Sequence, residues 1–302
     1  MNNLTLVTVL MLGIVSLSCQ NSTETEIEKA TANEGTKALD LSKEFKQHWF
    51  DGRAEVASYN LKQMRYGEAR EGKAVLIFVK EPFLQDEQVK ANAASLQTFD
   101  VLKLNATKKF TTGIYPYSIM QSTFSPLTTN THAVKVTAST QEWCGQTYMQ
   151  MNNRDAFKIA SHSYFEGEAD QNLSLNKTLL ENEIWNKLRI NPTEIKTGPQ
   201  KLIPDFSFIR LQHIPVKAYQ AEVQQQKNQD TLMTKIAYKN LDRILNIYQS
   251  TAFPFEILKW EEKTSEGDKN FTQAVLQKRL RLDYWNKNSN TFAFLRDSLQ
   301  LN

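Results

Sequence analysis

The sequence predicts a mainly β protein of the α+β class, an antiparallel meander that forms a large sandwich or an open barrel with two short helices. Short segments of alternating apolar and polar residues recur along the chain, with polar turns between them. Only two segments have the spacing of an amphipathic helix, and strands and helices do not alternate as in βαβ units. With 40% hydrophobic and 10% aromatic residues, the chain has enough apolar material for a packed core.

The first predicted element of the folded part is a short helix around Phe45. Leu41, Phe45 and Trp49 lie four residues apart, which puts their side chains on one helix face. Ser42 can cap the beginning of this helix, and Gly52 can end it.

Alternating segments then predict the strands of the first half. A hairpin is expected where two such segments flank the polar turn 70–73, and residues 83–98 are expected to form a loop. The predicted strands cover 56–66, 74–80, 99–105, 114–124, 134–138 and 157–165.

The second helix is predicted over residues 178–190. Thr178 and Glu181 have the spacing of a capping box, and Leu180, Ile184 and Leu188 form an apolar stripe. Further strands are predicted near 206–213, 216–224, 231–238, 243–248, 255–261 and 271–285.

The N-terminus has the pattern of an export signal. Residues 4–17 are apolar and uncharged, which is too short for a transmembrane helix of about 20 residues and fits the core of a signal peptide. Ser18 and Cys19 follow at once, as a lipoprotein signal peptidase requires. We therefore predict a signal peptide over 1–18 and a Cys19 that carries acyl chains such as palmitate, which anchor the protein to a membrane. A plain secretory signal is the alternative.

A tether and a single domain are predicted after Cys19. Residues 19–40 are rich in Ser, Thr, Asn and Glu, and residues 20–40 contain five acidic and two basic residues, a composition that cannot bury enough apolar surface to fold. Residues 41–302 are predicted to form one β-rich domain.

Composition excludes several classes of function. The chain has 10 glycines in 302 residues and contains neither GxGxxG nor GxxxxGK[ST], so no nucleotide-binding loop is expected. A net charge of +3 does not indicate a nucleic-acid partner. No cofactor is predicted, because two cysteines and four separated histidines do not form a zinc motif.

One constellation suggests nucleophilic chemistry. If Asn152 faces Asp155 across a turn, Cys144 lies beside Ser163, or beside His162 if Gly145 is a bulge. His162 could then deprotonate the Cys144 thiol, and Glu142 could orient the imidazole ring. The alternative is a buried cysteine that packs as a small apolar side chain.

A cluster of carboxylates follows the predicted strand that ends near residue 165. Glu166, Glu168 and Asp170 alternate, so they share one face of a strand or line a loop around a cation such as Ca²⁺. The alternative is a solvated strand end, in which the three charges stay apart.

Several motifs resemble those of an uncharacterised family of Gram-negative envelope lipoproteins whose members are often labelled "septum formation inhibitor Maf". The segments that carry the resemblance are 48–52 (HWFDG), 112–118 (TGIYPYS), 141–145 (QEWCG), 161–168 (SHSYFEGE) and 284–290 (YWNKNSN). The resemblance implies an exported lipoprotein and supplies no established reaction or catalytic residue. Maf nucleotide pyrophosphatases carry an SxSPRR motif, whereas the nearest string here, Ser125-Pro126-Leu127, lacks the arginines.

These observations predict a membrane-anchored lipoprotein of the cell envelope, at the outer membrane. Its domain is expected to bind a hydrophobic ligand or an envelope partner protein without catalysis. An envelope enzyme that uses Cys144 and His162 is the first alternative, and a Maf-type nucleotide pyrophosphatase is the second.

Overall fold

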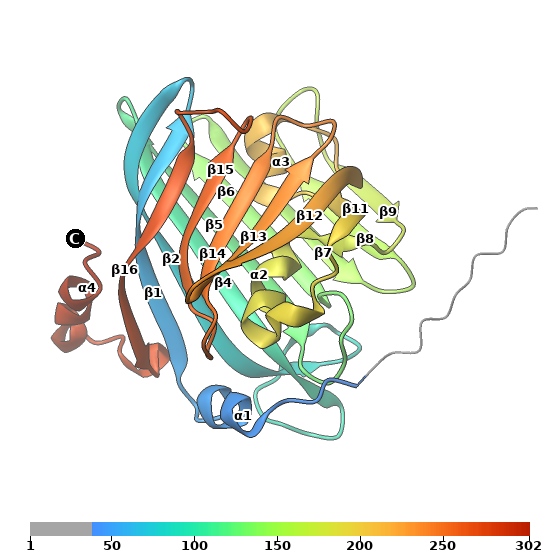
Figure 1. Cartoon of the computed structure of the whole chain (residues 1–302), viewed down its shortest axis with the longest axis vertical. Coiled ribbons are helices and arrows are strands. Elements are labelled where there is room, and N and C mark those ends of the chain that lie inside the picture. Colours follow the sequence, from blue (N-terminus) through green and yellow to red (C-terminus); the bar gives the residue numbers. More distant parts are fainter. Residues whose placement is uncertain (1–37) are drawn as a thin grey trace, which may run out of the picture. The chain divides into compact units, whose positions relative to one another are not determined.

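One large, twisted sheet is the framework of the protein (Figure 1). The computed structural model describes residues 38–302, and these belong to one compact unit that begins at Thr36. The sheet has 16 strands, is mostly antiparallel and does not close on itself, which confirms the predicted mainly β fold. The predicted signal peptide, Cys19 and almost all of the predicted tether lie outside the described residues.

The strands follow the alternating segments of the sequence and extend beyond most of them. The first nine are β1 (Ala54–Arg65), β2 (Glu68–Leu84), β3 (Val89–Lys90), β4 (Thr98–Thr112), β5 (Tyr115–Pro126), β6 (Lys135–Glu142), β7 (Gly145–Asn153), β8 (Phe157–His162) and β9 (Gln171–Leu175). The others are β10 (Leu179–Leu180), β11 (Gly198–Ile203), β12 (Tyr219–Asn228), β13 (Thr231–Tyr238), β14 (Ile244–Ser250), β15 (Ile257–Lys263) and β16 (Thr272–Leu282).

The strand order joins the two ends of the domain. β16 pairs with β1, so the second half of the meander continues into the first. The path of the sheet runs from β10 through β16, β1 and β5 to β9. Its two edge strands, β9 and β10, are therefore neighbours in the chain but not in the sheet, and this is where the sheet stays open.

Within residues 38–302, four short α-helices accompany the sheet, two more than predicted: α1 (Lys43–Trp49), α2 (Glu181–Ile190), α3 (Phe206–Gln212) and α4 (Phe294–Ser298). α1 and α2 are the two predicted helices. α3 lies where a strand was predicted, because Asp205 caps a helix by accepting hydrogen bonds from the backbone N–H groups of Ser207 and Phe208. At α2 the predicted cap is also wrong: Thr178 donates to the Lys201 carbonyl, and Glu183 accepts from the Leu180 N–H.

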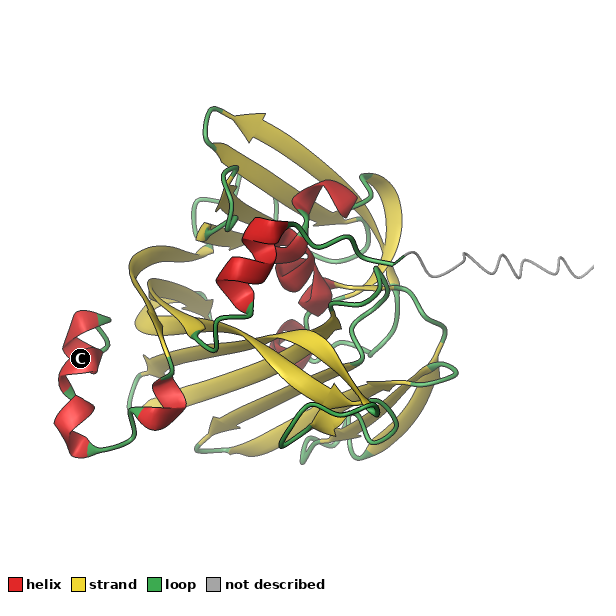
Figure 2. Ribbon diagram, turned by 90° about the horizontal axis from the view of Figure 1, so that it is seen from below, coloured by secondary structure: helices red, strands yellow, loops and turns green. Residues whose placement is uncertain are grey.

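The curved sheet wraps around α2 (Figure 2). Asn186 donates to the backbone carbonyls of Leu102 on β4 and Thr123 on β5. On the other side of the helix, Gln249 of β14 donates to the Leu188 carbonyl. α2 therefore connects both arms of the sheet from within.

Three apolar clusters pack the molecule. The largest joins α1, α2 and the inner face of the sheet, and includes Trp49, Ile184 and Trp260. A second packs α3 against β6, β7 and β8. A third lies where the C-terminal segment around Leu299 covers β1 and β2, beside α4 outside the sheet (Figure 1). All three use only residues from Leu41 onward, so we expect the chain from Thr36 onward to fold by itself.

Buried ion pairs hold both ends of α2. At its C-terminal end Arg189 donates to both carboxylate oxygens of Glu55 on β1, at 2.7 and 2.9 Å, and to the Pro254 carbonyl. At its N-terminal end Glu181 accepts from Arg243, which precedes β14. Both pairs are almost fully buried. If one partner were removed, water could not reach the remaining charge to solvate it.

Removal of one charge at the Glu55–Arg189 pair is expected to be far more harmful than removal of both. Glu55→Leu leaves a buried, uncompensated Arg189 and should lower the free energy of unfolding by about 3–5 kcal/mol. The double variant Glu55→Leu/Arg189→Met removes both charges and should recover at least half of that loss. Urea denaturation of the chain from Thr36 measures both values; a double variant as unstable as the single one would contradict the expectation.

The same pair predicts loss of stability in acid. Burial alone would raise the pKa of Glu55, but Arg189, with His48 and Arg279, lowers it from 4.5 to about 2. Between about pH 5 and 2, Glu55 becomes protonated in the unfolded chain but stays ionised in the folded chain. The free energy of unfolding therefore falls as the pH falls. The loss is on the order of 3 kcal/mol, since one pKa unit corresponds to about 1.4 kcal/mol.

Urea midpoints measured from pH 7 to pH 2 test this acid sensitivity. The double variant, which lacks the carboxylate, should lose less stability over this interval than the natural chain. Equal losses in the two proteins would contradict the assignment to Glu55.

Candidate functional site

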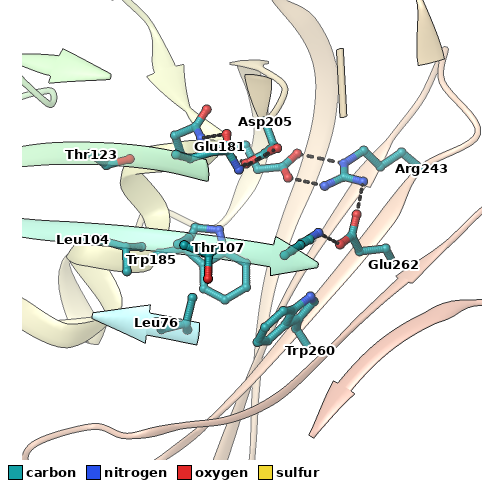
Figure 3. A pocket seen from close by; sticks show the side chains of 14 residues that line it. Leu76, Leu104, Thr107, Thr123, Glu181, Trp185, Asp205, Arg243, Trp260 and Glu262 are labelled. Carbon is teal, nitrogen blue, oxygen red and sulfur yellow. Dashed lines mark hydrogen bonds and ion pairs between the residues drawn. The ribbon is translucent and has the colours of Figure 1, made fainter. Parts of the chain in front are cut away.

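Two hollows in the described part of the fold are candidate sites. The first lies beside the N-terminal end of α2 and is lined by Trp185, Trp260 and several charged side chains (Figure 3). Its volume is about 40 Å³, which is room for roughly three water molecules. An organic ligand would not fit.

The charges around this first hollow are matched to one another. Arg243 lies between Glu181 and Glu262 (Figure 3), and Lys108 donates to Glu262 at 2.6 Å. Burial opposes the charge of Glu262, but Lys108 and Arg243 lower its pKa to about 2. This network therefore serves the docking of α2, and we do not assign it a ligand.

The second hollow lies between α3 and the strands β6, β7 and β8, and we call it the α3 pocket. Its volume is about 300 Å³, at the lower end of the range of small-molecule sites. Residues of loop 163–170 and of segment 214–216 also line it. Its apolar lining consists of Ala138, Met149, Leu173, Phe206, Ile209, Ile214, Pro215 and Val216.

The position of α3 shapes one wall of this pocket. Phe206 and Ile209 are buried in the second apolar cluster and hold the helix on β6 to β8. Arg210, which follows Phe206 by four residues, lies on the same side of the helix and lines the pocket. His213 ends the helix in the left-handed conformation, with φ +53°.

A chain of polar contacts forms one side of the α3 pocket. Glu168 accepts a hydrogen bond from Ser163 at 2.6 Å and contacts His213 Nδ1 at 2.5 Å. Arg210 Nη1 lies 3.4 Å from His213 Nε2. Because an arginine can only donate, Nε2 is the acceptor, and the ring proton lies on Nδ1, from which it is donated to Glu168.

The predicted register of the β7–β8 hairpin was wrong. The structure pairs Asn152 with Lys158 rather than with Asp155, because the connection is the longer loop 154–156. His162 therefore pairs with Tyr148, four positions from Cys144, or about 13 Å at a rise of ~3.3 Å per residue. His162 contacts Asp170 instead, at 3.4 Å.

Cys144 lies in the turn between β6 and β7, where it is exposed with a free thiol, so the alternative of a buried cysteine was also wrong. Its backbone N–H donates to Glu142, and a hydrogen bond with the Glu142 side chain is the main cause of a raised pKa of its thiol. Glu142 thus opposes thiolate formation at Cys144.

Gly145 has a steric function rather than the predicted bulge, since β6 and β7 pair without a register shift through Glu142 and Gly145. A Cβ at Gly145 would lie 2.6 Å from the ring of Tyr164. Tyr164 OH in turn donates to Glu142 at 3.2 Å. The glycine therefore allows loop 163–170 to lie against the β6–β7 turn.

The predicted carboxylate cluster lies in this loop, but two of its members turn to different partners. Glu168 contacts Ser163 and His213, whereas Asp170 contacts His162. Among residues 38–302 no three His, Cys, Asp or Glu side chains come together as metal ligands would, so the structure gives no support to the predicted cation site at Glu166, Glu168 and Asp170.

Sequence reasoning missed Arg210 and His213 as site residues. Residues 206–213 alternate like a strand, and a strand would have sent Arg210 and Ile209 to opposite faces. The Asp205 cap, followed by apolar residues at 206 and 209, is the signal that predicts the helix and hence the position of Arg210.

Comparisons with protein-family models, curated proteins and solved structures found no match to this chain. Within the described residues, no helix is long and apolar enough to cross a membrane. The assignment of the site therefore depends on its geometry.

The Cys144 thiol is expected to react slowly with iodoacetamide at neutral pH, because Glu142 raises its pKa above the ordinary value. Glu142→Gln removes the negative charge and should move the pH dependence of the alkylation rate to lower pH. Mass spectrometry of the alkylated protein measures the rates. Rapid alkylation of the natural chain, with no change in the variant, would contradict this and revive the thiol-enzyme hypothesis.

Proposed function

We propose that this chain is a membrane-anchored envelope lipoprotein whose folded domain binds a small hydrophobic ligand in the α3 pocket, without catalysis. The observation that carries the proposal is the pocket itself, which has a volume of about 300 Å³. Apolar residues form one part of its lining and polar residues the other. Such a lining favours a ligand with an apolar chain and one polar group. The apolar segment 4–17, followed by Cys19, supports the membrane anchor.

The thiol-enzyme alternative has less support. A nucleophilic cysteine needs a base within hydrogen-bond reach and a lowered pKa, whereas the neighbour of Cys144 is a carboxylate that raises its pKa. A non-catalytic role therefore agrees better with the surroundings of Cys144.

Two glycines allow a matched test of the pocket. Gly167 lines the pocket and Gly267 lies in the turn between β15 and β16; at both, an added Cβ would meet no atom within 4 Å. Gly167→Phe should fill part of the pocket and weaken binding of octyl methyl ether, an apolar chain, by at least about tenfold. Gly267→Phe should leave binding unchanged.

A ligand-observed NMR titration of the chain from Thr36 measures this affinity. Urea midpoints of both variants are compared first, so that any loss of binding reflects the pocket rather than unfolding. Absence of binding to the natural chain, or equal binding to both variants, would reject the α3 pocket as the ligand site.

A further inference from the structure

We propose that Arg210 binds the carbonyl oxygen of an acyl ester or amide, so that the ligand of the α3 pocket is a short acyl chain with its carbonyl group at Arg210. This inference rests on the proposed function and specifies its ligand class. Among the described residues, three arginines are buried: Arg189, Arg210 and Arg243.

Two of these arginines have partners for all three side-chain nitrogen atoms. Arg189 donates to both oxygens of Glu55 and to the Pro254 carbonyl. Arg243 donates to both oxygens of Glu181 and to Glu262. Such partners offset the cost of burying a guanidinium group, because each unmet donor loses its hydrogen bonds to water.

Arg210 is buried to a similar extent, 6% exposed, but its donors are largely unused. Its Nε is buried without a hydrogen-bond partner among the described residues. Nη2 lies 3.8 Å from Glu142 Oε1, beyond hydrogen-bond distance, and Nη1 makes the long contact of 3.4 Å to His213. The guanidinium carbon Cζ lies over the ring of Phe165, 4.1 Å from its centre.

The nearby carboxylates are engaged elsewhere. Glu142 accepts hydrogen bonds from the Cys144 N–H at 2.7 Å and from Tyr164 at 3.2 Å. Glu168 is bound by Ser163 and His213. The unused donors of a buried, pocket-lining Arg210 therefore fit an acceptor that a ligand brings with it.

The charges at this side of the pocket favour an uncharged acceptor. The positive charge of Arg210 lies 3.8 Å from Glu142, and a second carboxylate, Glu168, lines the same pocket, so an ionised acid would add a third negative charge. A ligand amine would bring donors and a positive charge to a guanidinium that needs an acceptor. A neutral carbonyl oxygen satisfies the donors without either repulsion.

The volume limits the chain length. At about 10–15 Å³ per water-sized group, as for the first hollow, 300 Å³ holds about 20–30 such groups. Methyl octanoate fits within this limit and is a suitable probe. Octyl methyl ether has a chain of similar length but lacks the carbonyl group, and octanoate carries the ionised acid.

The experiment measures Kd values for these three probes with the chain from Thr36 by ligand-observed NMR. The ester should bind at least about tenfold more tightly than the ether and more tightly than octanoate. Arg210→Met, which removes the donors, should abolish the preference for the ester while the ether still binds. Arg154→Met, a matched change at an exposed arginine outside the pocket lining, should leave the preference intact.

The outcomes separate this inference from the proposed function. If the ether binds and Gly167→Phe weakens it, but the ester is not preferred or Arg210→Met leaves the preference unchanged, the role of Arg210 is rejected and the pocket is retained. Tighter binding of octanoate than of the ester rejects the neutral carbonyl in favour of an acid. If none of the three probes binds, the proposed function itself is rejected.

Where Arg210→Met does not give the cooperative urea transition of the natural chain, Arg210→Lys replaces it. Lysine keeps the positive charge but loses the forked donors. The ratio of ester to ether affinity should then fall to less than half its value in the natural chain, and an unchanged ratio rejects the proposal.

Discussion

The burial of a charged helix inside a curved sheet is the constraint on which the rest of this structure depends. α2 has polar or charged side chains at five buried positions, among them Glu181 and Arg189 at its two ends. Such a helix is stable inside the fold only if each of these groups finds a partner, because the loss of water around an ion costs several kcal/mol. Glu55 on β1 and Arg243 beside β14 supply those partners from the two arms of the sheet.

The polar surface of α2 also positions the candidate site. Asn182 donates to Asp205 at 3.0 Å, and Asp205 is the residue that caps α3. α2 therefore holds the beginning of α3, and α3 carries Arg210 into the pocket. Arg210 then differs from the two arginines that hold α2, because its own hydrogen-bonding capacity is left open. We take this contrast within one molecule as the strongest indication of where a ligand binds.

Sequence reasoning was most accurate where structure is decided by near neighbours. Residues 231–238 are predicted as a strand and form β13 over the same positions, and the stripe of Leu180, Ile184 and Leu188 runs from the N-cap of α2 into the helix. It was wrong at 206–213, where the residues suit either period and the Asp205 cap, together with packing on β6 to β8, decides for a helix. A hairpin loop of different length was enough to shift His162 away from Cys144.

The sequence by itself determined the mainly β class, the two helices α1 and α2 and most of the strands, because alternation and helical spacing are properties of adjacent residues. Only the tertiary structure decided three other features: the pairing of β16 with β1, the position of α2 inside the sheet and the burial of its ion pairs. The pocket belongs to this second group. Arg210, His213 and Glu168 lie up to 45 residues apart in the chain and meet only because α3 packs on the sheet beside loop 163–170.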